Sequence, residues 1–369
     1  MASAAPGRAG AGLTGILDLP EHIARLSGEA RERADRLLEA VLIEGSAVPP
    51  PKLEPWLAAT FGSVDAVRHQ RLLRVTNLAT LESAVFAPLR ARRPVDGGRH
   101  WRDLAQEIAL TDGDPFCDAE HQTPADTFGR VRGVRMLTGA NAALADAHHA
   151  VLVFDHHDPL ALDAGLVRDL FDTGRAWADR ARTDDPTADR YLLIWNCLWR
   201  AGGSIIHGHA QALLGRGRHH AALDRFRRDA AGYRDAHRAD LLADLVAVHR
   251  DLELARDLGG GVTVLAHLTP VKERELLVVG PPGMDERDPA FADATWRSLA
   301  AYRDRLGVRS FNLALWRSPI AGSADGMPPM VRIVDRGDPM SRPSDIGAME
   351  LYGTPIVGSD PYQVVAAFD

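Results

Sequence analysis

The chain has 369 residues, 46% hydrophobic and 25% charged, a composition typical of a soluble globular protein with more than one packed unit. The formal net charge of −7 argues against a nucleic-acid partner. Two cysteines exclude a disulfide scaffold and favour a cytoplasmic location, and the lack of an apolar run of about 18 residues excludes a membrane span.

The first part of the chain carries apolar residues at helical spacing. Residues 19–42 and 53–75 both show apolar positions three and four apart, and the proline-rich residues 46–52 separate them. The pattern predicts two helices, and we expect residues 1–84 to form an N-terminal helical extension.

The next part of the chain alternates strand-like and helical segments. Residues 81–95 predict a strand that runs into a basic loop, and residues 112–126 predict a turn-rich loop. The segments that follow are rich in Val and Leu or amphipathic, and they predict in turn two strands, a helix and two strands: 131–137, 149–155, 158–181, 190–196 and 204–214.

The rest of the chain repeats this order more faintly. After a long helical segment over 219–259, it predicts two strands, a helix and two strands: 261–270, 273–281, 290–307, 310–319 and 329–337. Strand–strand–helix–strand–strand therefore occurs twice. We expect an α+β fold of two duplicated units, 85–230 and 231–369, each an antiparallel sheet with flanking helices.

Polar residues at every second position interrupt the apolar stretch AGGSIIHGHAQALLG, residues 201–215. In a strand, His207, His209 and Gln211 would lie on one face. Burying such groups without partners costs about 1–3 kcal/mol each, so we expect a phosphate or a metal ion to meet this face.

Imidazole and amide groups together suit phosphoryl chemistry. A neutral imidazole attacks phosphorus and leaves it readily, so a histidine can carry a nucleotidyl group between two displacements. A neighbouring amide can donate to the phosphoryl oxygens as their charge shifts. The alternative is a pair of structural histidines, in the core or on a metal. The adjacent pairs His148/His149 and His219/His220 are expected to be structural.

The sixteen residues NCLWRAGGSIIHGHAQ, 196–211, resemble the signature of the galactose-1-phosphate uridylyltransferase branch of the histidine-triad superfamily. The resemblance implies duplicated histidine-triad-like units and a catalytic group of His209, His207, Gln211 and Ser204. It makes His209 the nucleophile that becomes nucleotidylated, and Gln211 and Ser204 the groups that hold the phosphoryl oxygens. Asn196 and Gly203 would lie beside the nucleotide. The family usually has Pro where this chain has Gly208.

Three further segments extend the resemblance over about residues 85–215. FAPLRARRP is similar to an arginine-rich segment that contacts nucleotide phosphates, which implies phosphate contacts by Arg90, Arg92 and Arg93, although a solvated basic turn is the alternative. A second segment implies that Asn141 contacts the nucleoside. A third resembles a zinc loop and implies a structural zinc ion on Asp114, Cys117, His157 (or His156) and His207; the alternative is that zinc has been lost.

The second unit departs from the family pattern. MVRIVDRGD stands where the family has a His-x-His-x-Glu strand, and Pro343 and Met349 stand where it has hexose-binding residues. We therefore expect an acceptor other than galactose 1-phosphate.

The resemblance implies a nucleotidyltransferase. It would move a nucleoside monophosphate from a nucleotide sugar to a sugar 1-phosphate or similar acceptor through a covalent nucleotidyl-histidine. One alternative is a phosphorylase that acts on a nucleotide sugar or dinucleoside polyphosphate with inorganic phosphate as acceptor. Another is an inactive nucleotide-binding protein. Apart from zinc, no cofactor is expected; the partners would be nucleotide and phosphorylated sugars, with no nucleic acid or membrane, in a homodimer.

Overall fold

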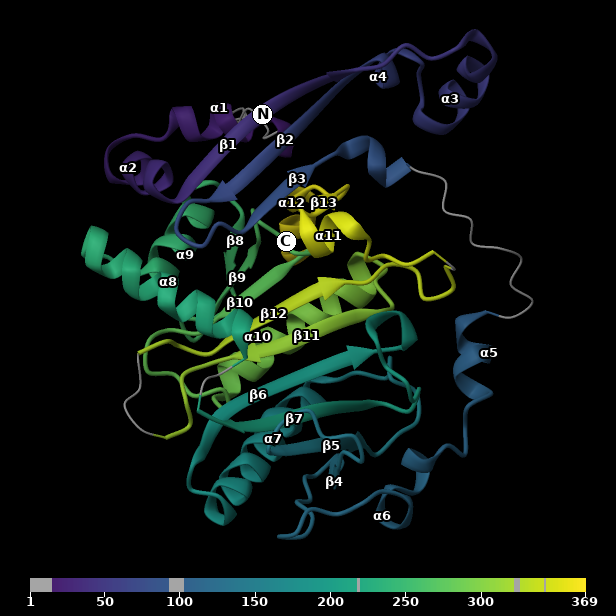
Figure 1. Ribbon diagram of the computed structural model, residues 1–369, viewed down its shortest axis with the longest axis vertical. Coiled ribbons are helices and arrows are strands. Elements are labelled where there is room, and N and C mark those ends of the chain that lie inside the picture. The colour runs from purple at the N-terminus through teal and green to yellow at the C-terminus, as the bar shows by residue number, and fades with distance from the viewer. Residues whose placement is uncertain (1–14, 93–102, 218–219, 322–325, 342) are drawn as a thin grey trace, which may run out of the picture.

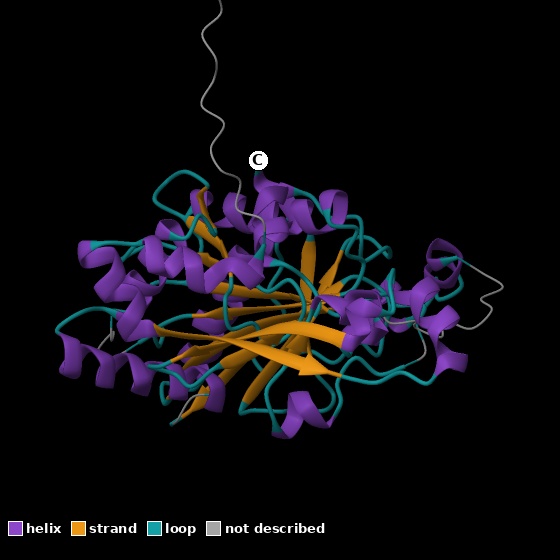
Figure 2. Ribbon diagram, turned by 90° about the horizontal axis from the view of Figure 1, so that it is seen from above, coloured by secondary structure: helices purple, strands orange, loops and turns teal. Residues whose placement is uncertain are grey.

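The computed structural model describes residues 15–92, 103–217, 220–321, 326–341 and 343–369. The strands form two sheets, a small one and a large one. Figure 1 draws the small sheet and the first helices above the large sheet, and Figure 2 shows strands in the middle of the molecule with helices on either side.

The small sheet has the order β1–β2–β3–β13, with bounds β1 Leu38–Ser46, β2 His69–Asn77, β3 Ser83–Phe86 and β13 Ile356–Val357. The helices before and between its first strands are α1 Leu19–Arg25, α2 Gly28–Leu37, α3 Glu54–Phe61 and α4 Asp65–Arg68. Sequence analysis predicted helix throughout 19–42 and 53–75, and that prediction is wrong for residues 38–42 and 69–75, which belong to β1 and β2. Helical spacing there is overridden by the antiparallel pairing of β1 with β2, which runs from Leu38 opposite Asn77 to Ser46 opposite His69.

The large sheet has nine strands in the order β4–β5–β7–β6–β11–β12–β10–β9–β8. Its bounds are β4 Met136–Ala140, β5 His148–Phe154, β6 Ala188–Cys197, β7 His209–Arg216, β8 Ala255–Asp257, β9 Thr263–Ala266, β10 Leu276–Val279, β11 Phe311–Trp316 and β12 Met330–Asp335. The helices beside it are α7 Ala164–Asp184 and α10 Pro289–Ala300.

The large sheet contains the predicted duplication. The order β4–β5–β7–β6 on one side is matched by β9–β10–β12–β11 on the other, and β6 pairs antiparallel with β11 where the two halves meet. α7 connects β5 to β6, α10 connects β10 to β11, and the two helices pack against each other. The predicted α+β class is therefore confirmed. The unit boundaries at 84 and 230 remain predictions; residue 230 lies within α8 (Ala221–His237).

The two faces of the large sheet differ in how they are covered. On β6, residues from Tyr191 to Cys197 alternate between buried and half-buried. Tyr191 and Leu193 point to α7, since a Cβ on Gly174 of that helix would touch both. The opposite face carries Ile194 and Asn196, which stay half-buried. This face is therefore less completely covered than the face against α7, and we call it the half-open face.

The remaining helices complete the described fold: α5 Leu104–Ala109, α6 Ala119–Gln122, α9 Leu241–Asp251, α11 Ala348–Tyr352 and α12 Pro361–Val365. Within the described ranges, no helix has the length and apolar character needed to cross a membrane.

A buried ionic network joins the two sheets. Arg332 of β12 is 8% exposed, and its Nε donates to Glu275 at 2.6 Å while its Nη1 donates to Glu82 at 3.0 Å. Glu82 immediately precedes β3 of the small sheet, and Glu275 precedes β10 of the large sheet. Trp316 lies under the guanidinium at 4.7 Å. The arginine thus connects the small sheet to the second unit.

Candidate functional site

His209 opens β7 on the half-open face and is 7% exposed. Its Nδ1 lies 2.8 Å from the carbonyl oxygen of His207. A carbonyl only accepts, so Nδ1 carries the proton and the neutral ring keeps a lone pair on Nε2. Burial lowers the pKa of His209, although this hydrogen bond acts to raise it. The lowered pKa favours the neutral ring. Among the described residues, no partner occupies Nε2, so the nitrogen is available as a nucleophile.

Gln211 lies two residues further along the same face of β7. It is half-buried, and its Oε1 lies 3.0 Å from Nε2 of His149 in β5. Asn141, just after β4, lies 3.3 Å from the same His149 nitrogen. The structure thus places the predicted Gln211 and Asn141 at one histidine that sequence analysis considered structural.

The glycine-rich segment forms a tight loop between β6 and β7. Leu198 has a φ of 68° and Gly202 a φ of 95°, so the chain turns sharply there. A Cβ on Gly203 would lie 3.0 Å from the carbonyl oxygens of both Asn196 and Leu198. This close approach gives Gly203 a structural reason for its lack of a side chain. Its contact with a nucleotide remains a prediction.

Asn196 is held in place by the second unit. Asn312 of β11 lies directly opposite it and donates to Asn196 Oδ1 at 2.7 Å and to the Ala201 carbonyl at 2.8 Å. Ser204, the other predicted residue of this loop, is exposed. Asn196 lies near the end of β6 and Ser204 in the loop that leads to β7, and their contacts with a nucleotide remain predictions.

The arginine-rich segment lies elsewhere in the chain's fold. Arg90 and Arg92 are exposed in the turn after β3, and Arg92 donates to the Phe61 carbonyl at 2.8 Å. Figure 1 draws β3 in the upper layer and β7 in the lower part of the view. Arg93 lies outside the described residues. Within those residues, neither Arg90 nor Arg92 bonds to a group of the His209 site.

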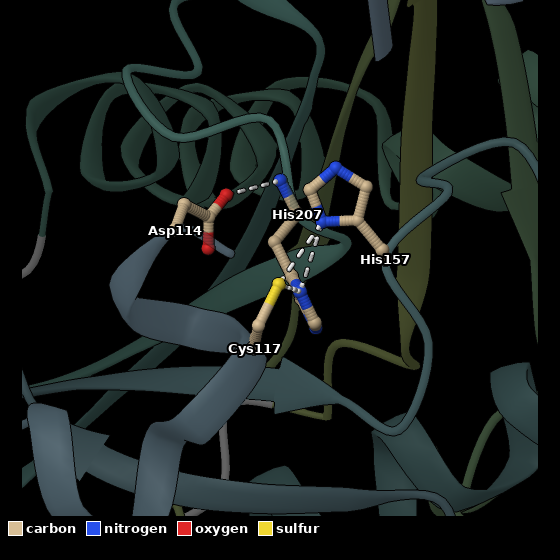
Figure 3. A group of neighbouring side chains, drawn as sticks. All are labelled: Asp114, Cys117, His157 and His207. Atoms are coloured by element: carbon tan, nitrogen blue, oxygen red, sulfur yellow. Dashed lines mark hydrogen bonds between the residues drawn. The ribbon is translucent and has the colours of Figure 1, made fainter. Parts of the chain in front are cut away.

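A compact group of potential metal ligands includes His207, two residues before His209. Cys117 Sγ is 3.3 Å from His157 Nδ1 and 3.4 Å from His207 Nδ1, and the two nitrogens are 3.3 Å apart (Figure 3). Ligand atoms of a tetrahedral zinc site lie roughly 3.3–3.6 Å apart. The Asp114 carboxylate completes the group, with all four ligand atoms within 4.8 Å of one another. The structure thus brings together the four residues that sequence analysis proposed.

Hydrogen bonds orient both histidines of this group. Nε2 of His207 lies 2.9 Å from the Phe154 carbonyl, and Nε2 of His157 lies 3.0 Å from the Ile108 carbonyl. Each Nε2 therefore carries the proton, and each Nδ1 lone pair points toward Cys117. Burial lowers the pKa of His207, which also favours a neutral ligand. His156, the alternative candidate, pairs with Asp155 instead.

Gly208, where the family usually has proline, is part of the local pairing. Its N–H donates to the His157 carbonyl at 3.0 Å, and its carbonyl accepts from Phe154 N at 2.9 Å. Proline could not make the first bond. A Cβ at this position would lie 2.7 Å from the Phe154 ring. The glycine therefore lets the two histidine-bearing segments approach each other.

We expect Gly208→Ala to lower the free energy of unfolding by about 1–3 kcal/mol, because the Phe154 ring must move. Urea unfolding of the purified variant checks this. Gly232→Ala is the matched control, since its Cβ would meet nothing within 4 Å in an exposed position of α8. Equal stability of the two variants would contradict the close packing at Gly208.

A cavity of about 370 Å³ opens beside the metal-ligand group. Its walls include Phe116, His207, Arg132 and Arg135. The ring of Phe116 also contacts His209 edge-on, with centroids 5.0 Å apart. The volume falls within the range of small-molecule sites.

Sequence analysis missed His149, Asn312 and Phe116. His149 had a signal, since its strand places it on the face of Gln211, but the register of β5 and β7 was unknown. Asn312 is a polar residue within an apolar strand, as Asn196 is, and this similarity could have suggested it. Phe116 offered no signal beyond its place between Asp114 and Cys117.

Comparison with known proteins gives matches by structure. No protein-family model matches the chain, and no curated protein matches it by sequence. An ADP-glucose phosphorylase from Arabidopsis thaliana with bound ADP-glucose is similar with a TM-score of 0.60 and 15% identity, over 79% of this chain and 97% of that protein. A GalT-like protein from Arabidopsis thaliana is similar with a TM-score of 0.56 and 14% identity, over 70% of this chain and 91% of that chain. A uridylyltransferase is similar with a TM-score of 0.55 and 15% identity, over 73% of this chain and 91% of that chain. The chain has the fold of these proteins, so the fold that the resemblance implied is confirmed.

Proposed function

We propose that this chain, which has the fold of galactose-1-phosphate uridylyltransferase-like proteins, is a nucleotidyltransferase that carries a nucleoside monophosphate on His209. The observation that carries the proposal is the lone pair on His209 Nε2, on a half-open sheet face that also bears the Gln211 amide. The bound ADP-glucose of one structure with this fold and the uridylyltransferase activity named for another support a nucleotide sugar as donor.

In the proposed first step, the Nε2 lone pair attacks the α-phosphorus of the nucleotide sugar. A P–N bond forms, and the P–O bond to the β-phosphate breaks, so the sugar 1-phosphate leaves with the electron pair. The proton stays on Nδ1, which continues to donate to the His207 carbonyl. In the second step, an oxygen of the acceptor phosphate attacks phosphorus, the P–N bond breaks and the neutral imidazole is regenerated.

The donor set fits a zinc ion, because two imidazole lone pairs and a thiol converge at tetrahedral spacing and a carboxylate lies within 4.8 Å of them. Asp114, Cys117, His157 and His207 would hold it. Bound zinc would have a structural role, because it would hold the loop before α6 against the start of β7. His207 would then be a ligand that positions the backbone carbonyl on which His209 depends.

Cys117→Ser should lower the zinc content from about one ion per chain to nearly none, because the thiolate is the strongest zinc ligand of the group. Elemental analysis of purified protein measures the content, and thermal unfolding should show a midpoint several degrees lower. His121→Ala removes an exposed histidine outside the group and is the control. Wild type that purifies without zinc and does not respond to a chelator would disprove the metal site.

The covalent route can be tested with ADP-glucose and UDP-glucose labelled at the α-phosphorus. Label should remain on denatured wild-type protein with at least one of them, and peptide mapping should locate it at His209. Addition of glucose 1-phosphate should remove the label and regenerate the nucleotide sugar. Turnover without any labelled protein would show that the covalent route is wrong.

A phosphorylase is the second candidate, supported by the ADP-glucose phosphorylase that matches 79% of this chain. The same residues would act, with inorganic phosphate as acceptor. Release of a nucleoside diphosphate from the labelled protein by phosphate alone would distinguish it from the transferase. The homodimer and the cytoplasmic location remain predictions from the sequence.

A further inference from the structure

His149 is a buried polar residue that lies beside the proposed nucleophilic centre. His149 is 4% exposed and lies in β5. β5 pairs with β7, and Val151 of β5 lies opposite Gln211 of β7. It therefore lies on the same sheet face as Gln211 and His209. The proposed mechanism gives it no direct contact with the substrate.

The backbone fixes the tautomer of this histidine. The Ala145 N–H donates to His149 Nδ1 at 3.2 Å. An N–H can only donate, so Nδ1 bears the lone pair and Nε2 of the neutral ring bears the proton. Two side-chain atoms lie near this N–H: Gln211 Oε1 is 3.0 Å and Asn141 Nδ2 is 3.3 Å from His149 Nε2. Only the oxygen can accept it, so the hydrogen bond runs from His149 to Gln211.

The same hydrogen bond fixes the amide of Gln211. Its oxygen is held by His149, and among the described residues its NH₂ group has no partner. An amide that turned over would present its oxygen, which repels phosphoryl oxygens, instead of its N–H donors. We propose that His149 is a positioning residue, which holds the Gln211 NH₂ group toward the phosphoryl group that His209 carries. The inference rests on the proposed function of His209.

Two substitutions separate the two nitrogens of His149. Gln at position 149 keeps a donor near the place of Nε2, whereas Asn keeps only an acceptor near the place of Nδ1. We expect His149→Asn to slow single-turnover labelling of the protein by ADP-glucose or UDP-glucose about 10- to 100-fold at saturating nucleotide, with KM little changed. His149→Gln should retain most of the rate. Equal losses in both variants would mean a merely structural role and would overturn the inference.

A double-mutant cycle tests whether His149 acts through Gln211. In the Gln211→Ala background, His149→Asn should cause no further loss of labelling rate, because no amide remains to be oriented. Losses that multiply would show that His149 acts by another route. Thermal unfolding of each variant separates poor folding from poor chemistry.

The tautomer can be read without any activity. Nitrogen NMR of ¹⁵N-histidine-labelled wild type, with His149→Gln to assign the signal, should show His149 protonated at Nε2 and not at Nδ1. If this holds but neither nucleotide sugar labels the protein, the proposed function fails while the hydrogen-bond arrangement stands. If His149 is protonated at Nδ1, the inference is wrong even where labelling succeeds.

Discussion

His209→Ala should lower the rate of nucleotidyl transfer about ten-thousand-fold or more, and no label from a nucleotide sugar should remain on the protein. The imidazole is the group that forms the P–N bond, and alanine offers no replacement nucleophile. Single-turnover labelling and steady-state transfer both measure the effect. Nucleotide binding should survive, because the other contacts of the site are unchanged.

His121→Ala is again the matched control, since this exposed histidine pairs with Asp118 and lies outside the metal-ligand group. It should transfer at the wild-type rate. A His209→Ala enzyme that still transfers at a tenth of the wild-type rate or faster would mean that another group carries the nucleotide or that none does. Similar unfolding midpoints for both variants would exclude a folding defect.

Arg332→Met should lower the free energy of unfolding by about 3–5 kcal/mol. The substitution leaves Glu275, only 2% exposed, as a buried charge without its partner, and it breaks the link to Glu82. Urea unfolding at neutral pH measures the loss. The double variant Arg332→Met/Glu275→Gln should recover part of it, because the unpaired buried charge is then gone.

Arg25→Ala is the control, since the pair of Arg25 with Glu21 is largely exposed and should add little. Burial alone would raise the pKa of Glu82, but Arg332 and His267 together outweigh burial and hold the pKa well below its usual range. A carboxyl whose pKa is lowered on folding stabilises the protein fully above its unfolded pKa of about 4.3, and less as the pH falls below that value. In wild type this contribution should therefore stay constant from pH 8 to pH 5. In Arg332→Met, burial without the arginine raises the carboxyl pKa, so the difference in unfolding free energy between the two proteins should narrow as the pH falls. A difference that stays the same between pH 8 and pH 5 would contradict this account of the buried carboxyls.

Most of the large sheet could be predicted from the sequence, because most of its strands are short apolar runs, many of them with Leu or Val. β5 and β6 lie close to their predicted positions, and the order of elements predicted the duplication. The N-terminal hairpin could not be predicted in this way. Its apolar residues fit helical spacing as well as strand alternation, and only pairing between residues 23 to 39 positions apart, such as Leu42 with Leu73, decides between them.

The predicted row of three polar residues was correct only in part. His209 and Gln211 lie in β7, but His207 precedes the strand and its ring points to Cys117. Alternation along a strand gives the faces of its residues but not the residue where the strand begins. The hydrogen bonds of Gly208 with Phe154 and His157 set that beginning. Phe154 ends β5 and His157 follows it, so the partners come from another part of the chain.

The sequence by itself determined the chemistry that is available: an imidazole, an amide, a glycine-rich turn and four potential metal ligands, in an order that resembles one family. Only the tertiary structure decided which nitrogen of each ring holds a proton, because the carbonyl or N–H that fixes it comes from the folded backbone around the ring. For the same reason the role of His149 was hidden, since its partner lies 62 residues away and is brought near by the register of two strands.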